Sequence, residues 1–312
     1  MIQILDPGLL TTVQDCGRWG YQSLGVPVSG PMDRVSHVTA NRLVGNESRS
    51  ATLEVTLHGP RLAFLADTTF AVAGARFELW LDTRPVSCGV AYRAPVGSEL
   101  GFGRRRGGAR AYVAVAGGVD IPRALGSRST DLASGLGGLG GRALRAGDRL
   151  DVGSTRHGPP MVSPLVSGTT LPDGGATVRV LAGPDFRLLT SDALAELTRN
   201  RFKLASVSNR MAYRFEGPRI ELACTQGRLS TPTPMGTLQV PPSGHPILLM
   251  ADRQTTGGYD HVATVISADL PVAGQLAPGD WMTFRVCERR DALAALITLE
   301  QKRALGPVAA GN

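Results

Sequence analysis

The chain has 312 residues, of which 42% are hydrophobic and 19% charged, and its formal net charge at pH 7 is +7. This composition is typical of a soluble globular protein with one or two domains. No apolar run reaches the 18 or so residues of a membrane-spanning helix, so we expect no membrane partner. No helix-turn-helix, zinc-finger or RNA-binding aromatic pattern is present, and we expect no nucleic-acid partner despite the basic charge.

Cysteine and histidine patterns exclude several further classes. The four cysteines are scattered and form no CxxC pair, which argues against a zinc ribbon or a thioredoxin-like site. The five histidines show no metal spacing such as HExxH, so no metal site is predicted. The N-terminal stretch lacks a basic region and a cleavage pattern, which predicts no signal peptide. We therefore expect reduced thiols and a cytoplasmic location.

Short apolar stretches separated by frequent glycine (39) and proline (21) favour an all-β architecture. The chain also contains an internal repeat. Five pairs of segments match in the same order: 2–8 with 178–184, 59–62 with 217–220, 94–103 with 241–250, 112–122 with 262–271, and 146–148 with 278–280. Such an ordered repeat predicts two homologous, mainly β domains.

The segment 154–176 is rich in Pro, Gly, Ser and Thr and is typical of a linker. We therefore expect an N-terminal domain over 1–160, a C-terminal domain over 175–290, and a helix with a tail over 291–312. Start and stop signals predict three peripheral helices: Asp33–Val44, Ser191–Asn200 and Asp291–Leu305.

One connection is unusually polar for its place in the chain. Residues 252–259 read DRQTTGGY and separate two apolar runs, 246–251 and 262–266, which we interpret as a hairpin. The equivalent tip of the first domain is Arg104–Arg110, and both tips keep a Gly-Gly that suits a turn. Only the second tip keeps Asp, Gln and Thr beside the glycines, which indicates a ligand-binding loop.

The residue types of this loop suit an anion. Adjacent hydroxyl groups and the two glycines of Thr255–Gly258 allow several donors to converge on one carboxylate or phosphate. Arg253 offers a bidentate fork. Asp252 is suited to act as a base or to orient the arginine.

Three further polar clusters stand out at 11–21, 29–33 and 208–213. The second precedes the first predicted helix, whose N-terminus favours an anion. Turns use the same residue types, so each cluster also has a purely structural interpretation. Residues 135–141, GLGGLGG, lack the Gly-Lys-Ser/Thr of a nucleotide-binding loop, and we interpret them as a flexible loop.

Together these motifs resemble one family. They are residues 12–21, 29–33, 126–131, 208–213, 239–242 and 251–259. The family is known as allophanate hydrolase subunit 2, as the C subunit of 5-oxoprolinase, or as KipA, and it is biotin-dependent carboxyltransferase-like. The resemblance covers about residues 2–286 and implies tandem cyclophilin-like β-barrel domains with a few peripheral helices.

The resemblance implies a component of an ATP-dependent 5-oxoprolinase, which opens the lactam of the small-molecule substrate pyroglutamate. It also implies two protein partners, an allophanate hydrolase subunit 1 (KipI-type) chain and a chain like the A subunit of 5-oxoprolinase. ATP is held either by this chain or by a partner.

Two alternatives remain open. One is half of a biotin-dependent carboxyltransferase like that of urea carboxylase, with biotin carried on another protein because no Ala-Met-Lys-Met-like site is present. The other is a KipA-type regulator without catalytic activity. Allophanate hydrolysis by this chain alone is not expected, because no Ser-Ser-Lys amidase motif occurs.

The sequence departs from the family motif at Asn209, where Asp is expected, and at Ala212, where Gly is expected. The first change removes a carboxylate, so we assign no acid/base role there. The segment 223–237 is also atypical.

The loop is expected to hold the substrate carboxylate or the transferred phosphate, and the other groups to supply acid/base help and orientation. The predicted catalytic residues are Gln14, Asp15, Arg18, Asp252 and Arg253. The predicted substrate-binding residues are Ser29, Asp33, Arg210, Tyr213, Gln239, Gln254, Thr255, Thr256, Gly257, Gly258 and Tyr259.

Overall fold

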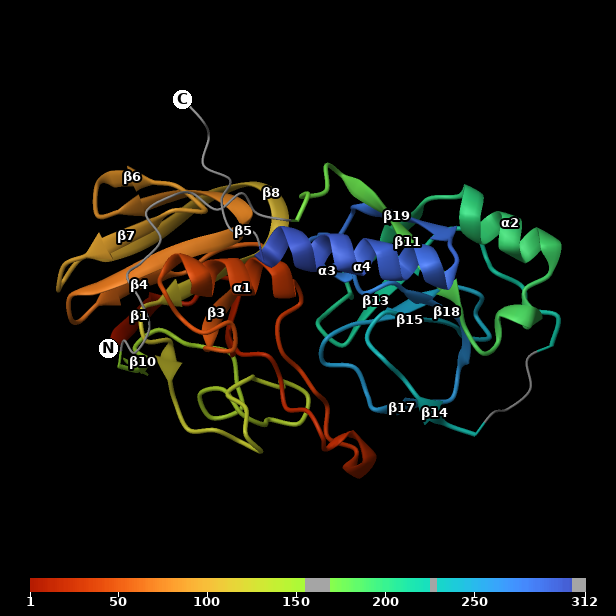
Figure 1. Ribbon diagram of the computed structural model, residues 1–312, viewed down its shortest axis with the longest axis horizontal. Helices are drawn as coiled ribbons and strands as arrows, with labels where there is room; N and C mark the ends of the chain where they lie inside the picture. Colours follow the sequence, from red (N-terminus) through yellow and green to blue (C-terminus); the bar gives the residue numbers. More distant parts are fainter. Residues whose placement is uncertain (155–168, 225–228, 305–312) are drawn as a thin grey trace. The chain divides into compact units, whose positions relative to one another are not determined.

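The computed structural model describes residues 1–154, 169–224 and 229–304, except for the side chains of 303 and 304. The described residues form two compact units, one of 1–18, 29–154, 169–171 and 302–304, the other of 19–28, 172–224 and 229–301. Both are mainly β with few helices, so the predicted fold class is confirmed (Figure 1). The predicted linker and the boundary at residue 160 lie in a stretch, 155–168, outside the described residues.

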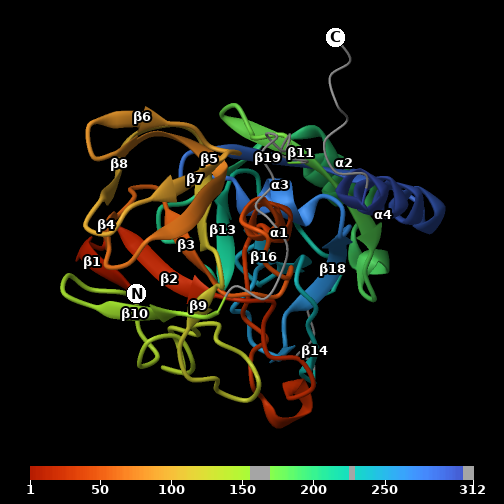
Figure 2. The ribbon, with the colours of Figure 1, turned by 60° about the vertical axis from the view of Figure 1, so that its left-hand side comes forward.

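The first unit is built from ten strands and one helix. They are β1 (Ile2–Asp6), β2 (Leu10–Gln14), α1 (Arg34–Leu43), β3 (Thr52–Thr56), β4 (Arg61–Phe64), β5 (Thr68–Leu81), β6 (Arg84–Val86), β7 (Ala91–Ala94), β8 (Glu99–Val115), β9 (Val119–Asp120) and β10 (Arg149–Val152). The sheet order is β2-β3-β8-β4-β1-β10-β9, and β5 pairs with β6, β7 and β8. Figure 2 shows β1 beside β10.

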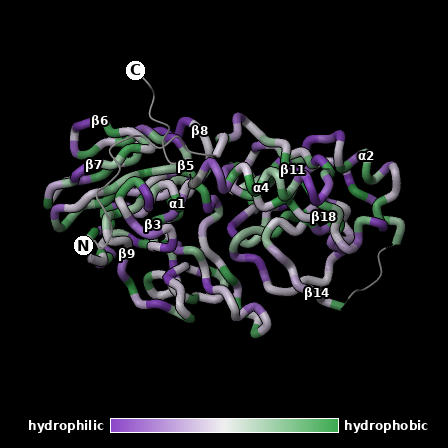
Figure 3. Tube along the Cα trace, in the orientation of Figure 1, coloured by the Kyte–Doolittle hydropathy of each residue, from purple (hydrophilic) through white to green (hydrophobic). Residues whose placement is uncertain are grey.

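The core of this unit lies between the strands, where alternate residues point inward. Ile2, Leu53, Phe64 and Val113 are among its fully buried members. In Figure 3, apolar colouring follows the strands of this unit. Burial of this apolar surface is the main stabilising contribution to the fold.

Arg104–Arg110 does not form a hairpin tip, so that prediction was wrong. These residues lie inside β8, whose 17 residues pair with β5. The register between the two strands shifts in this region, and Arg76 faces Gly107. The Gly-Gly therefore serves an irregularity within a long strand pair, which a turn signal resembles in sequence.

Helix α1 lies close to its predicted bounds. Asp33 caps its N-terminus by accepting a hydrogen bond from the backbone N–H of Ser36 at 3.0 Å. The helix packs Ala40 and Leu43 on Ala73 of β5 and Tyr112 of β8. It therefore covers one face of the β5–β8 pair, and the polar cluster at its start is fixed to the sheet.

The second unit is a closed barrel with the strand order β11-β18-β15-β16-β13-β12-β19. Its elements are η1 (Gln22–Leu24), β11 (Gly175–Ala182), η2 (Phe186–Leu188), α2 (Ser191–Arg199), β12 (Phe202–Leu204), β13 (Ala212–Glu216), β14 (Thr231–Pro232), β15 (Thr237–Val240), β16 (Ile247–Leu249), β17 (Thr256–Gly257), β18 (Asp260–Val265), α3 (Leu270–Gly274), β19 (Trp281–Val286) and α4 (Arg289–Ala304). Helices α2 and α4 match two predicted helices to within two residues. No helix in the described parts of the chain is long and apolar enough to cross a bilayer.

The polar stretch 252–259 does not close a hairpin, so that prediction was also wrong. Strands β16 and β18 do not pair with each other, because β15 lies between them. The connection must cross the end of β15, which explains its length. On the way, β17 pairs with β14, which comes from the segment that looked atypical in sequence.

Candidate functional site

The polar connection of the second unit is anchored at its start by a buried ion pair. Arg210 donates from Nε to Oδ2 of Asp252 at 2.8 Å and from Nη2 to Oδ1 at 2.9 Å. Both side chains are almost fully buried. The backbone N–H of Asp252 also donates to the carbonyl of Arg210 at 2.9 Å. Both carboxylate oxygens are thus engaged, which favours an orienting role for Asp252 over that of a base.

Arg253 is placed differently from its neighbour. Its guanidinium donates to carbonyl oxygens, from Nε to Thr233 at 2.8 Å and from Nη1 to Ala251 at 3.5 Å. No carboxylate among the described residues forms an ion pair with it, although it is only 9% exposed. Burial lowers its pKa, and the charge of Asp252 partly offsets this effect. A buried cation without an ion-pair partner suits an anionic ligand.

Thr233 connects Arg253 with the rest of the connection. Its Oγ1 donates to the carbonyl of Gln254 at 2.6 Å, and its N–H donates to the carbonyl of Thr255 at 3.0 Å. Beyond this point Thr256 and Gly257 form β17. The β14–β17 pair therefore ties Thr256 and Gly257 of the predicted loop to Thr231 and Pro232.

Gln239 of β15 is 1% exposed. Its Nε2 has no hydrogen-bond partner among the described residues. Tyr213 is also buried, whereas Tyr259 and the backbone of Gly258 are exposed. Of the predicted substrate-binding residues of this unit, Tyr213 and Gln239 are therefore buried, whereas Gly258 and Tyr259 are exposed.

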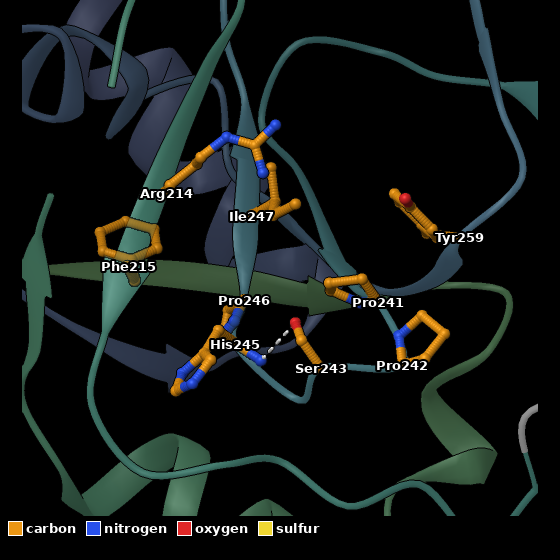
Figure 4. A pocket seen from close by; sticks show the side chains of 9 residues that line it. All are labelled: Arg214, Phe215, Pro241, Pro242, Ser243, His245, Pro246, Ile247 and Tyr259. Atoms are coloured by element: carbon orange, nitrogen blue, oxygen red, sulfur yellow. Dashed lines mark hydrogen bonds between the residues drawn. The ribbon is translucent and has the colours of Figure 1, made fainter. Parts of the chain in front are cut away.

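A cavity of about 400 Å³ opens beside Tyr259 (Figure 4). Arg214 and Tyr259 lie on opposite sides of it, and the backbone N–H of His245 donates to Ser243 Oγ at 3.5 Å. Its volume lies in the range of small-molecule sites. The polar residues and prolines that line it include Arg214, Pro241, Pro242, Ser243, His245 and Tyr259.

Asn209, one of the departures from the family motif, has a local role. Its Oδ1 accepts hydrogen bonds from the backbone N–H groups of Met211 at 2.8 Å and Ala212 at 3.2 Å. This arrangement is an Asx-type turn next to Arg210. An amide oxygen fills that role without a charge.

In the first unit, the predicted residue Asp15 is the centre of a hydrogen-bonded cluster. Its carboxylate accepts from Gly17 N at 2.9 Å, Ser127 Oγ at 2.5 Å, Arg128 N at 2.6 Å and Ser129 Oγ at 2.7 Å. Burial raises its pKa, but these hydrogen bonds together outweigh burial and hold the pKa below its usual value. Asp15 is therefore ionised at neutral pH and is a weak base.

Two neighbours of Asp15 are also buried. Arg18 donates from Nη1 to Ser29 Oγ at 3.3 Å and from Nη2 to the carbonyl of Ser129. Gln14 donates from Nε2 to the carbonyl of Thr130 at 3.0 Å, and its Oε1 has no partner among the described residues. The structure thus brings Gln14, Asp15, Arg18 and Ser29 together around one loop, residues 127–130.

The glycine-rich stretch 135–141 contributes to this cluster, which the sequence did not indicate. A Cβ atom on Gly137 would lie 2.1 Å from the carbonyl oxygen of Ser129 and 2.3 Å from Arg18 Nη2. A Cβ on Gly138 would lie 2.1 Å from Thr130 Oγ1. The glycines let the loop pack on the arginine, and they leave no space for a phosphate at these two positions.

The first unit also contains a buried polar network that the sequence did not predict. Glu54 Oε2 accepts from Tyr112 Oη at 2.7 Å and from Met32 N at 2.9 Å, and Tyr112 Oη accepts from Asp33 N at 2.8 Å. His37 lies edge-on to Tyr112. The tyrosine and histidine stand among apolar residues in sequence, so only their three-dimensional proximity reveals the network.

The titratable groups of this network are strongly perturbed. Burial, with the charge of Glu54, raises the pKa of Tyr112 well above its usual value. Burial lowers the pKa of His37 to about 4, so its ring is neutral at pH 7. Since Asp33 caps α1 within this network, we assign Asp33 a structural role beside its predicted one.

The described residues contain no group of three or more His, Cys, Asp or Glu side chains suited to a metal ion. A second cavity, of about 370 Å³, lies in the first unit. Three arginines, Arg49, Arg123 and Arg128, line it together with two carboxylates, Glu47 and Asp120. Arg49 is paired with Glu47 and Arg128 with Asp120, so three positive and two negative side chains leave this lining with a net charge of +1.

The family described as "Carboxyltransferase domain, subdomain A and B" matches residues 24–286, and the chain belongs to it. The resemblance inferred from the motifs is therefore confirmed.

Individual members of this family can be compared with the chain. The chain is 38% identical to the C subunit of 5-oxoprolinase from Escherichia coli (strain K12), over 95% of this chain and 94% of the relative. It is 37% identical to the C subunit of 5-oxoprolinase from Haemophilus influenzae, over 94% and 93% of the two chains. The crystal structure of the Kluyveromyces lactis urea amidolyase is similar with a TM-score of 0.89 and 30% identity. That match covers 96% of this chain but only 20% of the amidolyase.

Proposed function

We propose that this chain is a component of an ATP-dependent 5-oxoprolinase, which converts pyroglutamate to glutamate. The observation that carries the proposal is the similarity to two 5-oxoprolinase C subunits over nearly their whole length. The name of these relatives implies a multi-subunit enzyme. We infer that the partners are a subunit 1 (KipI-type) chain and a chain like the 5-oxoprolinase A subunit.

The second unit supplies a site that suits pyroglutamate. Arg253 is a nearly buried cation without a carboxylate partner in the described chain, and it fits the substrate carboxylate. The Arg210–Asp252 pair orients the connection from which Arg253 projects. The cavity beside Tyr259, in the same unit but not lined by Arg253, has a volume that suits a small ring. In this proposal, the chain binds and orients the lactam rather than supplying a strong base.

ATP supplies the phosphoryl group that activates the lactam carbonyl for attack by water. In this proposal a phosphate binds at Arg123 of the second cavity, where the other two arginines, Arg49 and Arg128, are already paired with Glu47 and Asp120. Asp15 accepts the backbone N–H of Arg128, so this cavity is joined to the predicted residues of the first unit.

A second candidate function is the carboxyltransferase half of a urea carboxylase-like enzyme. The family description and the similarity to the Kluyveromyces lactis urea amidolyase favour it. In that case biotin arrives on another protein, because this chain has no attachment motif. The KipA-type regulator has no comparable support from the relatives described.

The two candidate functions differ in the substrate that supports activity. The chain, co-purified with its partner subunits, is supplied with ATP and either pyroglutamate or urea with carboxybiotin carrier. Glutamate release in the first mixture supports the oxoprolinase. Carboxylation of urea alone would replace it with the carboxyltransferase.

A further inference from the structure

The cavity beside Tyr259 has a lining with an unbalanced positive charge. Among the nine residues that line it, Arg214 is the single arginine or lysine, and none is an aspartate or a glutamate. In the part of the chain that the structure describes, no hydrogen bond or ion pair engages the guanidinium of Arg214. A cavity of about 400 Å³ that contains one unpaired cation has both the room and the charge to bind a small anion.

This arginine projects from a fixed point of the barrel. The backbone N–H of Arg214 donates to Ser208 Oγ at 3.0 Å, and its carbonyl accepts from the N–H of Ala205 at 2.9 Å. In the β13–β16 pair, Arg214 lies opposite Ile247. Residues that oppose each other in antiparallel strands have side chains on the same face, so the buried Ile247 provides an apolar floor next to the cation. The position of the arginine in the cavity wall is therefore set by strand pairing.

Three prolines and a tyrosine form much of the remaining wall. Pro241, Pro242 and Pro246 line the cavity, and each proline ring fixes its own φ angle. The turn between them is closed by a hydrogen bond of 2.8 Å from the N–H of Gly244 to the carbonyl of Pro241. Tyr259 lies on the side opposite the arginine (Figure 4). Proline and tyrosine rings pack well against flat apolar groups, and a preformed wall loses little conformational entropy when a ligand binds.

We propose that the cavity beside Tyr259 binds a small aromatic carboxylate. Arg214 holds the carboxylate through two parallel hydrogen bonds, which a guanidinium without another partner is able to form. The aromatic ring of the ligand lies between Tyr259 and the prolines, over Ile247, because a flat apolar group matches these walls. The inference goes beyond the proposed function, since this ligand is not the lactam and Arg253 does not line the cavity.

The test titrates the full chain with cinnamate, a flat aromatic carboxylate, and follows binding by ligand-observed NMR. We expect one saturable site per chain with a Kd of about 5 mM or tighter, as a ligand of this size allows. Acetate has the same charge but no ring, and it should bind at least about 10-fold more weakly because it leaves the proline and tyrosine walls uncovered. No saturable binding of cinnamate, or equal affinity for acetate, would overturn the inference.

Two variants test the two halves of the ligand separately. Arg214→Met keeps an unbranched side chain but removes the charge, and we expect it to bind cinnamate at least about 10-fold more weakly. Tyr259→Ala removes one wall of the ring site and should weaken cinnamate binding about 5-fold. Both side chains are exposed, so the Tm of each variant should stay within about 2 °C of the wild type. Arg199→Met, which replaces an exposed arginine of α2 outside the cavity, is the matched control and should bind cinnamate like the wild type.

One further variant separates this cavity from the site of the proposed function. Arg253→Ala should leave the affinity for cinnamate within about twofold of the wild type, because Arg253 does not line the cavity. Loss of binding in Arg253→Ala with normal binding in Arg214→Met would place the ligand elsewhere and overturn the inference. An equal loss in Arg214→Met and Arg199→Met would show attraction by net charge alone and would overturn it as well. None of these results depends on pyroglutamate turnover, so the proposed function is tested independently.

Discussion

Arg210 and Asp252 form a bidentate ion pair inside the second unit, with Nε–Oδ2 and Nη2–Oδ1 distances of 2.8 and 2.9 Å. The two residues are 42 positions apart in the chain. Their pairing fixes the start of the polar connection to the turn before β13. Arg253 follows directly, so the ion pair determines where that guanidinium lies.

Removal of one charged partner of this ion pair should lower the stability of the fold. Asp252→Ala leaves the charge of Arg210 buried without its carboxylate, and we expect the free energy of unfolding to fall by about 3–5 kcal/mol. Denaturant unfolding of the isolated chain measures this change. The exposed carboxylate of Glu216 in β13 provides the control, since Glu216→Ala should change stability by less than about 0.5 kcal/mol. A loss at Asp252 no larger than at Glu216 would show that the pair does not anchor the loop.

Asp15 should make stability depend on pH in the acid range. Its folded-state pKa lies below the ordinary value of 3.8, so its contribution is complete above pH 3.8. As pH falls further, the unfolded state takes up the proton first, and the contribution is lost through the folded-state pKa. Asp15→Asn should therefore be less stable than wild type by about 1–3 kcal/mol near neutrality, and the difference should shrink below pH 3.8. A difference that is constant down to pH 2 would contradict this account.

His37 should make stability depend on pH over a higher pH range than Asp15 does. Burial lowers its pKa from 6.5 to about 4, so between these values the unfolded state binds a proton that the folded state does not. Stability is therefore lost as pH falls from 6.5 towards 4, by about 3 kcal/mol over the whole range. In His37→Gln this slope should disappear, whatever the overall stability of the variant. Unfolding titrations at half-unit pH steps measure it, and an unchanged slope would assign the titration to another group.

The glycine-rich loop offers a matched pair of substitutions. Gly135 and Gly137 both have positive φ values, +65° and +70°, and alanine is strained at each. Only at Gly137 would the new methyl group also meet Ser129 and Arg18; at Gly135 nothing lies within 4 Å. We expect Gly137→Ala to cost about 1–3 kcal/mol more than Gly135→Ala in thermal or denaturant unfolding. Equal costs would mean that the loop does not pack on Arg18 as described.

Local patterns in the sequence predicted the class of fold and the helices well. The cap at Asp33 and the leucine spacing of α2 are short-range signals, and both act within one helical turn. The two hairpin predictions, at 104–110 and 252–259, failed for a common reason. A Gly-Gly between apolar runs suits a turn, a bulge or a crossover, and only strand pairing decides among them.

For the candidate site, too, the sequence carries the local signals but not the long-range contacts. The polarity of residues 252–259 is unusual between two apolar runs, and this signal is local. The contact of Gly137 with Arg18 and the pairing of Glu54 with Tyr112 join residues 119 and 58 positions apart, as the numbering shows. Sequence spacing carries no information about such contacts, so neither the loop nor the network could be recognised from one sequence.

The measurement that tests the central claim most directly is ATP hydrolysis that depends on pyroglutamate, in the complex of this chain with its subunit 1-type and A-type partners. We expect one glutamate per ATP, and no turnover when any of the three chains is omitted. Arg253→Ala should still co-purify with its partners and lose at least about 100-fold in kcat/KM, whereas the exposed Arg199→Ala should match wild type. A folded complex that hydrolyses no ATP with pyroglutamate, or full activity in Arg253→Ala, would contradict the account.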